Sequence, residues 1–165
     1  MTTVFTIGHS NHSAEHFVGL LRQHGIATLA DVRSLPYSRW APQFRKDELA
    51  RSLGDAGIEY VFLGRELGGR PDGAEFYTAD GKVDYARRAQ AADFQAGIER
   101  IIELARRGPT AILCAEEDPG RCHRRLLVTP VLIERGIAVE HIRGDGRLEA
   151  EGTAEDGAPQ LRLFE

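Results

Sequence analysis

The sequence predicts an α/β protein, a three-layer sandwich in which a mainly parallel central sheet of about five strands carries helices on both faces. Short β-rich runs alternate with helix-period segments along the chain. Residues 110–115 are apolar without alternation, as expected of a central parallel strand covered on both faces. The length of 165 residues fits one domain. We therefore predict a single α/β domain over residues 1–143.

The predicted elements follow one another in a β-α-β-α order. Ser13 can cap a first helix, which Gly25 ends, and a second helix ends at Gly57. A longer helix carries an apolar stripe from Phe94 to Ala105, and a last helix over 121–135 should be kinked by Pro130. The strands are expected at residues 4–9, 28–33, 59–63, 110–115 and 138–142.

Two segments lack the pattern of a core element. Residues 64–81 are rich in glycine and contain a proline, so we expect a long functional loop there. Residues 144–159 are poor in large apolar side chains and resemble a flexible linker. We therefore assign residues 144–165 to a linker and a C-terminal peptide motif.

Charge and hydropathy limit the possible partners. The formal net charge is −4, so a nucleic acid would have to bind a local basic patch. No apolar run is long enough to cross a bilayer, and no signal peptide is recognisable, so we expect a cytoplasmic protein with no membrane partner. Its two cysteines are expected to be reduced there.

Chemically versatile side chains follow three of the predicted strands. Because ligands of parallel α/β sheets bind outside the carboxyl ends of the strands, these positions are candidate site residues. The first group is His9, Ser10 and Asn11, in which His9 can serve as acid, base or ligand. The alternative is an ordinary turn in which Ser10 and Asn11 satisfy backbone groups.

The cysteine loop, residues 114–124, is the densest cluster of reactive side chains. Cys122 beside His123 and two arginines could have a lowered pKa, and Glu116 could orient His123. Cys114 could instead be an inert core residue, or the two cysteines could form a reversible disulfide. Three acidic residues in the loop argue against phosphatase chemistry. The predicted catalytic residues are His9, Cys114, Glu116, Cys122 and His123.

Residues 31–46 interleave aromatic and basic side chains. Arginine binds phosphates and exposed aromatic rings stack on bases, so this stretch could hold a single strand or a nucleotide. Alternatively, Trp40 and Phe44 anchor the loop on the core while the arginines are solvated. The predicted substrate-binding residues are Ser10, Asn11, Arg33, Tyr37, Arg39, Trp40 and Arg124.

The combination of these segments resembles the bacterial and archaeal family catalogued as domain of unknown function 488. The resemblance spans residues 5–142 and implies an α/β fold with a shared site built from the same strand ends. It brings no established reaction. The matching pieces are residues 6–10, 31–33 with Pro36 and Ser38, 67–69, 114–116 and 122–124.

The last six residues resemble the short peptide motif that binds bacterial sliding clamps. Gln160 would supply hydrogen bonds, and Leu161, Leu163 and Phe164 would enter an apolar groove. Tethering of this kind raises the local concentration on DNA without a basic surface. The alternative is a tail that folds back on its own domain.

Together these features favour an enzyme of nucleic-acid or nucleotide metabolism, with DNA repair as one process it could serve and with no reaction class assigned. It would bind an anionic substrate, DNA or a nucleotide, at the carboxyl ends of the strands. One alternative is a thiol-redox or metal-binding protein using Cys114, Cys122 and His123. Another is a non-catalytic adaptor tethered to a clamp through residues 160–164. No cofactor is identified, and no residue is assigned to a metal.

Overall fold

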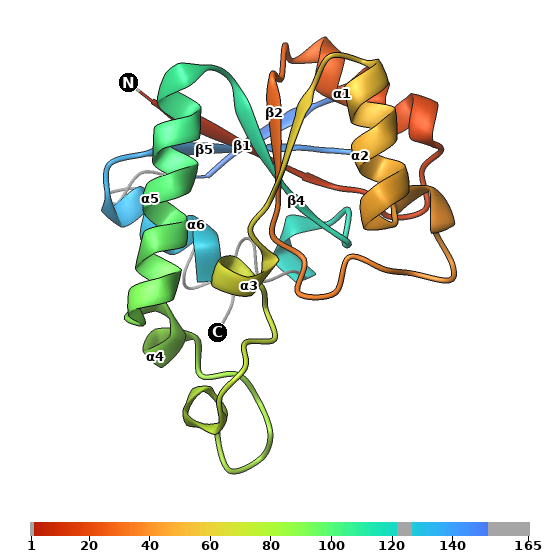
Figure 1. The fold of residues 1–165 in the computed structure, drawn as a ribbon. Coiled ribbons are helices and arrows are strands. Elements are labelled where there is room, and N and C mark those ends of the chain that lie inside the picture. Colours follow the sequence, from red (N-terminus) through yellow and green to blue (C-terminus); the bar gives the residue numbers. More distant parts are fainter. Residues whose placement is uncertain (1, 122–126, 152–165) are drawn as a thin grey trace.

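The computed structural model describes residues 2–121 and 127–151, which form a six-stranded sheet with helices on both faces (Figure 1). The strand order is β3-β2-β4-β1-β5-β6, and all pairs are parallel except β5 with β6. The predicted α/β sandwich is confirmed. The strands are β1 (Thr3–Gly8), β2 (Thr28–Asp31), β3 (Glu59–Phe62), β4 (Thr110–Cys114), β5 (Ala138–Ile142) and β6 (Leu148–Ala150).

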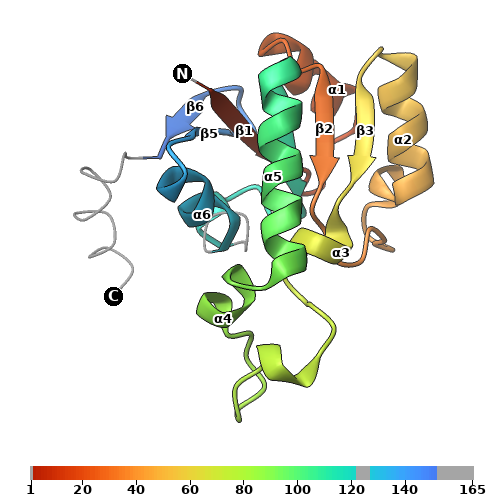
Figure 2. The ribbon, with the colours of Figure 1, turned by 60° about the vertical axis from the view of Figure 1, so that its left-hand side comes forward.

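Two helices cover each face of the sheet. Figure 2 shows α5 (Ala92–Arg107) lying along one face, with α6 (Thr129–Glu134) beside it. The other face carries α1 (Ala14–Gln23) and α2 (Lys46–Asp55). Every residue of β2 and β4 is buried, and for β4 the unbroken apolar run at residues 111–115 predicts this, as in a central parallel strand.

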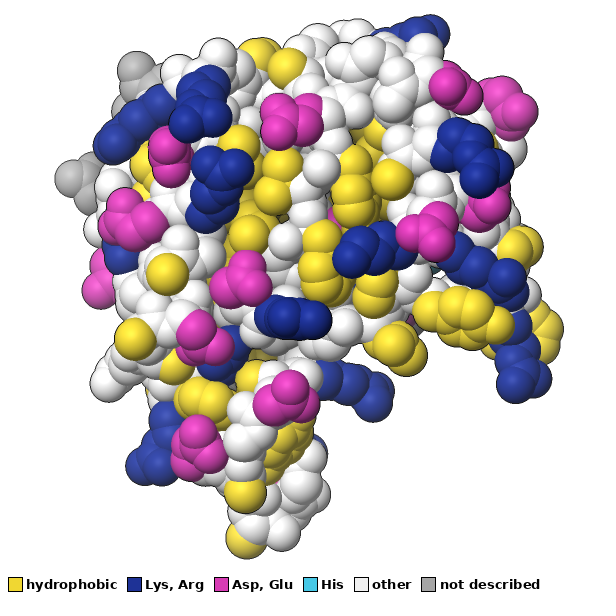
Figure 3. Space-filling view, viewed as in Figure 1, with side chains coloured by type: hydrophobic (Ala, Val, Ile, Leu, Met, Phe, Trp, Pro, Cys, Tyr) yellow, Lys and Arg dark blue, Asp and Glu magenta, His cyan; other side chains and the backbone are white. Residues whose placement is uncertain are grey.

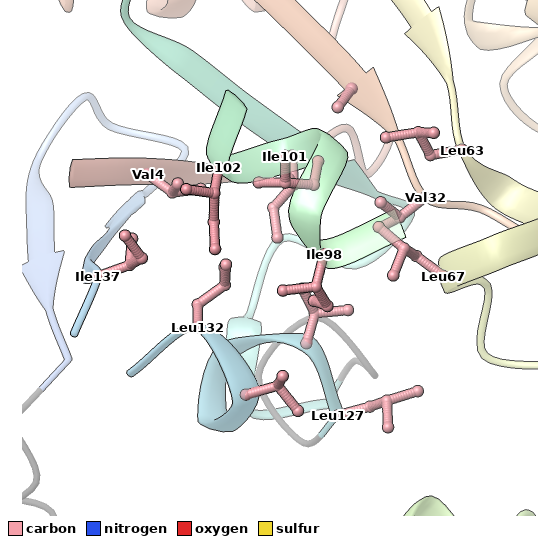
Figure 4. Packing of buried hydrophobic residues seen from close by; sticks show 14 of the residues in the cluster. Val4, Val32, Leu63, Leu67, Ile98, Ile101, Ile102, Leu127, Leu132 and Ile137 are labelled. Atoms are coloured by element: carbon pink, nitrogen blue, oxygen red, sulfur yellow. The ribbon is translucent and has the colours of Figure 1, made fainter. Parts of the chain in front are cut away.

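The two apolar cores follow from the alternation of side chains along each strand. On the α5 side, Val4 packs in one cluster with Ile98 and Ile101 (Figure 4). Ile112 belongs to the same cluster, and all four side chains are fully buried. On the α1 side, Ile7 packs with Phe17 and its neighbours. Removing a large aliphatic side chain such as Ile98 from this packing costs about 2–5 kcal/mol. These cores fix the strand ends that carry the candidate site.

Glycine turns and short helices connect the strands and the long helices. Positive φ angles at Gly25 (66°) and Gly57 (75°) follow the ends of α1 and α2, as the sequence predicts. The remaining elements are η1 (Pro42–Phe44), α3 (Gly64–Leu67), η2 (Ala74–Phe76), α4 (Tyr85–Ala89) and η3 (Pro119–Arg121).

Three local predictions need correction. The segment at residues 64–81 contains α3 and η2 and is not a plain loop. Pro130 lies in the first turn of α6, and residues 127–128 before it are π-helical, so the described part of the helix predicted over 121–135 is not one α-helix with a kink in its interior. The stretch assigned to a linker from residue 144 contains β6, because Glu140, His141 and Ile142 pair with it as an antiparallel edge.

No helix among the described residues is long and apolar enough to span a bilayer.

Candidate functional site

The ends of β1 and β4 continue to pair beyond the strands and bring two predicted site segments together. The backbone N–H of His9 donates to the Cys114 carbonyl at 3.0 Å, and that of Ser10 donates to the Ala115 carbonyl at 2.8 Å. Gly8 makes this approach possible, because a Cβ there would lie 1.6 Å from the Glu116 carbonyl oxygen. The predicted site therefore has a common edge, here called the carboxyl edge of the sheet.

His9 is a nearly buried imidazole at this edge, with 4% of its surface exposed. Its Nδ1 lies 2.7 Å from the Ser10 carbonyl oxygen, which can only accept, so Nδ1 carries the proton and Nε2 the lone pair. Its ring stacks on Phe44, with the centroids 4.6 Å apart. Burial, reinforced by the charge of Arg33, lowers the pKa of His9 to about 4. The side chain is therefore neutral at pH 7.

Ser10 adopts a left-handed backbone conformation with φ of 44°, unlike every other non-glycine residue that the structure describes. Such a conformation costs a non-glycine residue on the order of 1 kcal/mol and is found more often at functional sites. Ser10 and Asn11 are both exposed. Their side chains are thus available to a ligand at the carboxyl edge.

Arg33 forms a buried bidentate ion pair with Asp31. Its Nε and Nη2 donate to the two carboxylate oxygens of Asp31 at 2.9 and 2.8 Å, and its Nη1 donates to the Phe44 carbonyl at 2.7 Å. Tyr60 donates its hydroxyl to the same carboxylate at 2.6 Å, and burial beside Asp31 raises the pKa of Tyr60. The substrate-binding role of Arg33 stays a prediction, while these contacts show the side chain bracing the loop.

Residues 34–46, here called the aromatic loop, combine a buried anchor with an exposed tip. Ala41 and Phe44 are buried, with 3% and 1% of their surfaces exposed, whereas Trp40 is 84% exposed. The expectation that Trp40 and Phe44 both anchor the loop is therefore correct for Phe44 and wrong for Trp40. Leu35 and Tyr37 are also exposed, and the guanidinium of Arg45 lies 4.5 Å from the centre of the Tyr37 ring.

A second polar group lies where β1 and β5 end. The rings of His12 and His16 are 4.8 Å apart, and His16 Nε2 donates to the Gly144 carbonyl at 2.8 Å. Glu117 accepts from the Gly144 N–H at 2.8 Å and from Arg143 Nε at 2.9 Å. Sequence reasoning missed this group, although the four-residue spacing of His12 and His16 across a helix start was a usable signal.

The cysteine loop is only partly described. Cys114 is buried and disulfide-bonded, which differs from the expected reduced thiol, and Glu116 is exposed. Cys122, His123 and Arg124 lie outside the described residues, as do Gln160, Leu161, Leu163 and Phe164. Their predicted roles stay predictions.

Within residues 2–121 and 127–151, no group of three or more His, Cys, Asp or Glu side chains is arranged to hold a metal ion. His12 Nε2 is enclosed and has no hydrogen-bond partner within the same ranges. The chemistry available at the described part of the carboxyl edge is that of His9, the group of His12, His16 and Glu117, exposed hydroxyl and amide groups, and the aromatic loop.

Comparison with known proteins gives a family and no activity. A family model described as "Domain of unknown function DUF488" matches residues 13–130, a range that holds the aromatic loop and the cysteine loop but begins after His9. No curated protein and no solved structure matches the chain. The chain therefore belongs to the DUF488 family.

Proposed function

We propose that this protein is an enzyme of nucleic-acid or nucleotide metabolism that binds an anionic substrate at the carboxyl edge of the sheet. One observation carries the proposal. Phe44 links a group capable of proton transfer to a loop suited to nucleotides, since its ring stacks on His9 and its carbonyl is held by Arg33. The base of the aromatic loop is thus packed against the proton-transfer group.

His9 is the candidate acid–base residue. Its proton sits on Nδ1, and the neutral ring presents Nε2 as an acceptor. An anionic ligand beside the ring would raise the pKa of His9, because a nearby negative charge favours imidazolium. The ring could then take a proton from the bound substrate and return it.

The aromatic loop is the candidate substrate-binding segment. Residues 34–46 contain three basic side chains and no acidic one, although the whole chain carries a net charge of −4. Arg39 and Lys46 are exposed, as are Tyr37 and Trp40 of the same loop, and the Lys46 ammonium lies 4.2 Å from the centre of the Phe62 ring. In Figure 3, hydrophobic and basic side chains lie together at the lower right. In the same view of Figure 1, the chain that follows β2 runs through this region. Such a surface attracts phosphates and offers rings to bases.

A nucleotide panel tests this proposal directly. Trp40 is the single tryptophan of the chain, so its fluorescence reports on the aromatic loop. Mono- and oligonucleotides should quench it and raise the melting temperature, and Arg39→Ala should weaken both effects. Arg106→Ala, an exposed arginine on α5, is the control. His9→Gln should retain binding and lose any conversion of the ligand that mass spectrometry detects. If no member of the panel binds, the proposal is wrong.

Thiol–disulfide chemistry is the second candidate function, favoured by the disulfide at Cys114. A reversible disulfide takes up two electrons and two protons to give two thiols, and dithiothreitol can supply them. Thiol titration with and without this reductant measures the exchange, and elemental analysis of the purified protein tests the metal-binding alternative. Slowly reacting thiols that stay free without reductant, and no bound metal, would rule this candidate out.

The link to a sliding clamp and to DNA repair is a further proposal that rests on residues 160–164 alone. Leu163→Ala and Phe164→Ala should abolish binding of the purified protein to the clamp of the same organism. A non-catalytic adaptor would lose its function with the tail and keep it after substitutions at the carboxyl edge. Absence of clamp binding by the intact protein would refute both ideas.

A further inference from the structure

Resting on the function proposed above, we infer that the ligand of the aromatic loop is single-stranded nucleic acid, selected over duplex by an acidic arm beside the loop. The arm consists of residues 71–84 and joins α3 to α4. Two features carry the inference. The loop presents open rings with cations beside them, and the chain that leaves this surface turns strongly acidic.

The backbone of the aromatic loop and its Tyr37 ring are held in place before any ligand arrives. The N–H of Lys46 donates to the Pro36 carbonyl at 3.0 Å and closes the loop, while Arg33 holds the Phe44 carbonyl from inside. Arg45 covers one face of the Tyr37 ring and Nη2 donates to its hydroxyl at 3.3 Å. A base can therefore stack on Tyr37 without first ordering the chain, which lowers the entropic cost of binding.

Exposed apolar area at this place indicates a binding surface. Leu35, Tyr37 and Trp40 are 73%, 56% and 84% exposed and lie within six residues of one another. Clustered exposure of this kind on a loop with a buried anchor marks an interaction site. The nearby cations, Arg39, Arg45 and Lys46, favour a polyanion over an apolar partner.

The open shape of this surface favours single-stranded nucleic acid over a mononucleotide or a duplex. At 84% exposure, Trp40 has no enclosing wall, so a mononucleotide would gain one stacking contact and little else. In a duplex the base faces are already stacked on one another and cannot reach the rings. A single strand can place successive bases on Tyr37 and Trp40 while its phosphates meet the cations.

The acidic arm begins one residue after a contact with the base of the aromatic loop. Ser34 Oγ accepts from the N–H of Arg70, the residue that precedes the arm, at 2.8 Å. The arm contains four acidic residues and one lysine and projects from the body in Figures 1 and 2. It is closed by the Tyr77 hydroxyl, which donates to the Pro71 carbonyl at 2.8 Å, and its Phe76 ring packs 4.8 Å from the buried guanidinium of Arg88. A broad duplex on the loop would bring its phosphates toward these carboxylates, whereas a narrow strand could avoid them.

Fluorescence anisotropy with a labelled oligothymidylate of about ten nucleotides, its duplex and thymidine monophosphate tests the inference. We expect the strand to bind at least tenfold more tightly than either of the others. Trp40→Ala and Tyr37→Ala should each weaken strand binding about tenfold, Trp40→Phe should restore most of it, and Arg106→Ala should change nothing. Binding should weaken with salt at a slope of about −2 if three phosphates are neutralised.

Neutralising the arm tests the selectivity. Asp72→Asn, Glu75→Gln and Asp80→Asn together should strengthen duplex binding at least threefold and leave strand binding within twofold, and circular dichroism checks folding. An unchanged duplex affinity overturns the role of the arm. Equal affinity for the strand and the monophosphate overturns the single-strand inference and leaves the proposed function standing. Failure of every nucleotide and nucleic acid to bind overturns the proposed function itself.

Discussion

The imidazole of His9 lies on the phenyl ring of Phe44 at a centroid distance of 4.6 Å and an interplanar angle of 22°. His9 follows β1 and Phe44 ends η1, so the stack joins the carboxyl edge of the sheet to the base of the aromatic loop. Phe44 also makes an edge-to-face contact with Phe17 of α1, with the two ring centroids 5.0 Å apart. Substitutions of these residues and their neighbours can show which side chains stabilise the fold and which serve binding or proton transfer.

Removing the ionisable ring of His9 should make stability less dependent on pH. The folded pKa of about 4 lies below the ordinary value of 6.5, so the unfolded chain binds a proton between these values that the folded chain does not. The stabilisation that the neutral His9 ring contributes is therefore fully present above pH 6.5 and is lost as the pH falls toward 4. The loss from pH 7 to pH 5 is about 2 kcal/mol for this group.

Urea denaturation of wild type and His9→Gln at pH 7 and pH 5 measures this difference. His9→Gln should show a smaller loss on acidification than the wild type. His12→Gln is the comparison variant: the pKa of His12 is also lowered, mainly by burial, so this variant should lose a contribution of its own and keep most of that of His9. Equal acid sensitivity of wild type and His9→Gln would contradict the prediction.

Breaking the buried ion pair should destabilise the whole domain. Asp31→Asn leaves the guanidinium of Arg33 buried without its counter-charge, which costs about 3–5 kcal/mol. Arg107→Ala removes an exposed helical pair with Glu103 and should cost at most about 0.5 kcal/mol. Chemical denaturation compares the two variants, and similar losses would mean that the Asp31–Arg33 pair is not a structural brace.

Two aromatic residues four positions apart should contribute very different amounts to the free energy of unfolding. Phe44→Ala empties a fully buried site and should lower the free energy of unfolding by about 3–5 kcal/mol. Trp40→Ala removes an exposed side chain and should change it by at most about 0.5 kcal/mol. Circular dichroism melts test the pair, and a large loss in Trp40→Ala would show that the exposed ring supports the fold.

Two glycines on successive elements give a matched test of backbone crowding. Gly8→Ala forces a methyl group onto the Glu116 carbonyl and should destabilise the protein by about 3 kcal/mol or more. Gly19→Ala, in the exposed middle of α1 with nothing within 4 Å, should stabilise it by up to about 1 kcal/mol. Thermal melts of both variants test this prediction. If Gly8→Ala leaves the melting temperature unchanged, the end of β1 can move away from the chain that follows β4.

The sequence predicted those helices and strands whose own residues carry a clear apolar or capping pattern. The apolar stripe of α5, the Ser13 cap of α1, where Ser13 Oγ accepts from the His16 N–H, and the buried run of β4 all agree with the structure. The short strand β6 escaped prediction, because three exposed residues carry no apolar period and only pairing with β5 orders them.

The sequence predicted which segments lie side by side but not the contacts between their side chains. The rule that strand ends form ligand sites places His9 and Cys114 together, and their backbones are hydrogen-bonded. Sequence could not tell which of Trp40 and Phe44 is buried, since both fit an anchor. It also could not show that Asp31 occupies the guanidinium of Arg33, because two-residue spacing permits that contact without requiring it.

The exposure of Trp40 has a practical consequence for following the folding of this protein. Its indole is surrounded by water in the native state and in the denatured state alike. An emission melt excited at the indole band would therefore be nearly silent as the core comes apart. Backbone ellipticity is the appropriate reporter of denaturation for this chain, and indole emission is left as an independent channel for titrations.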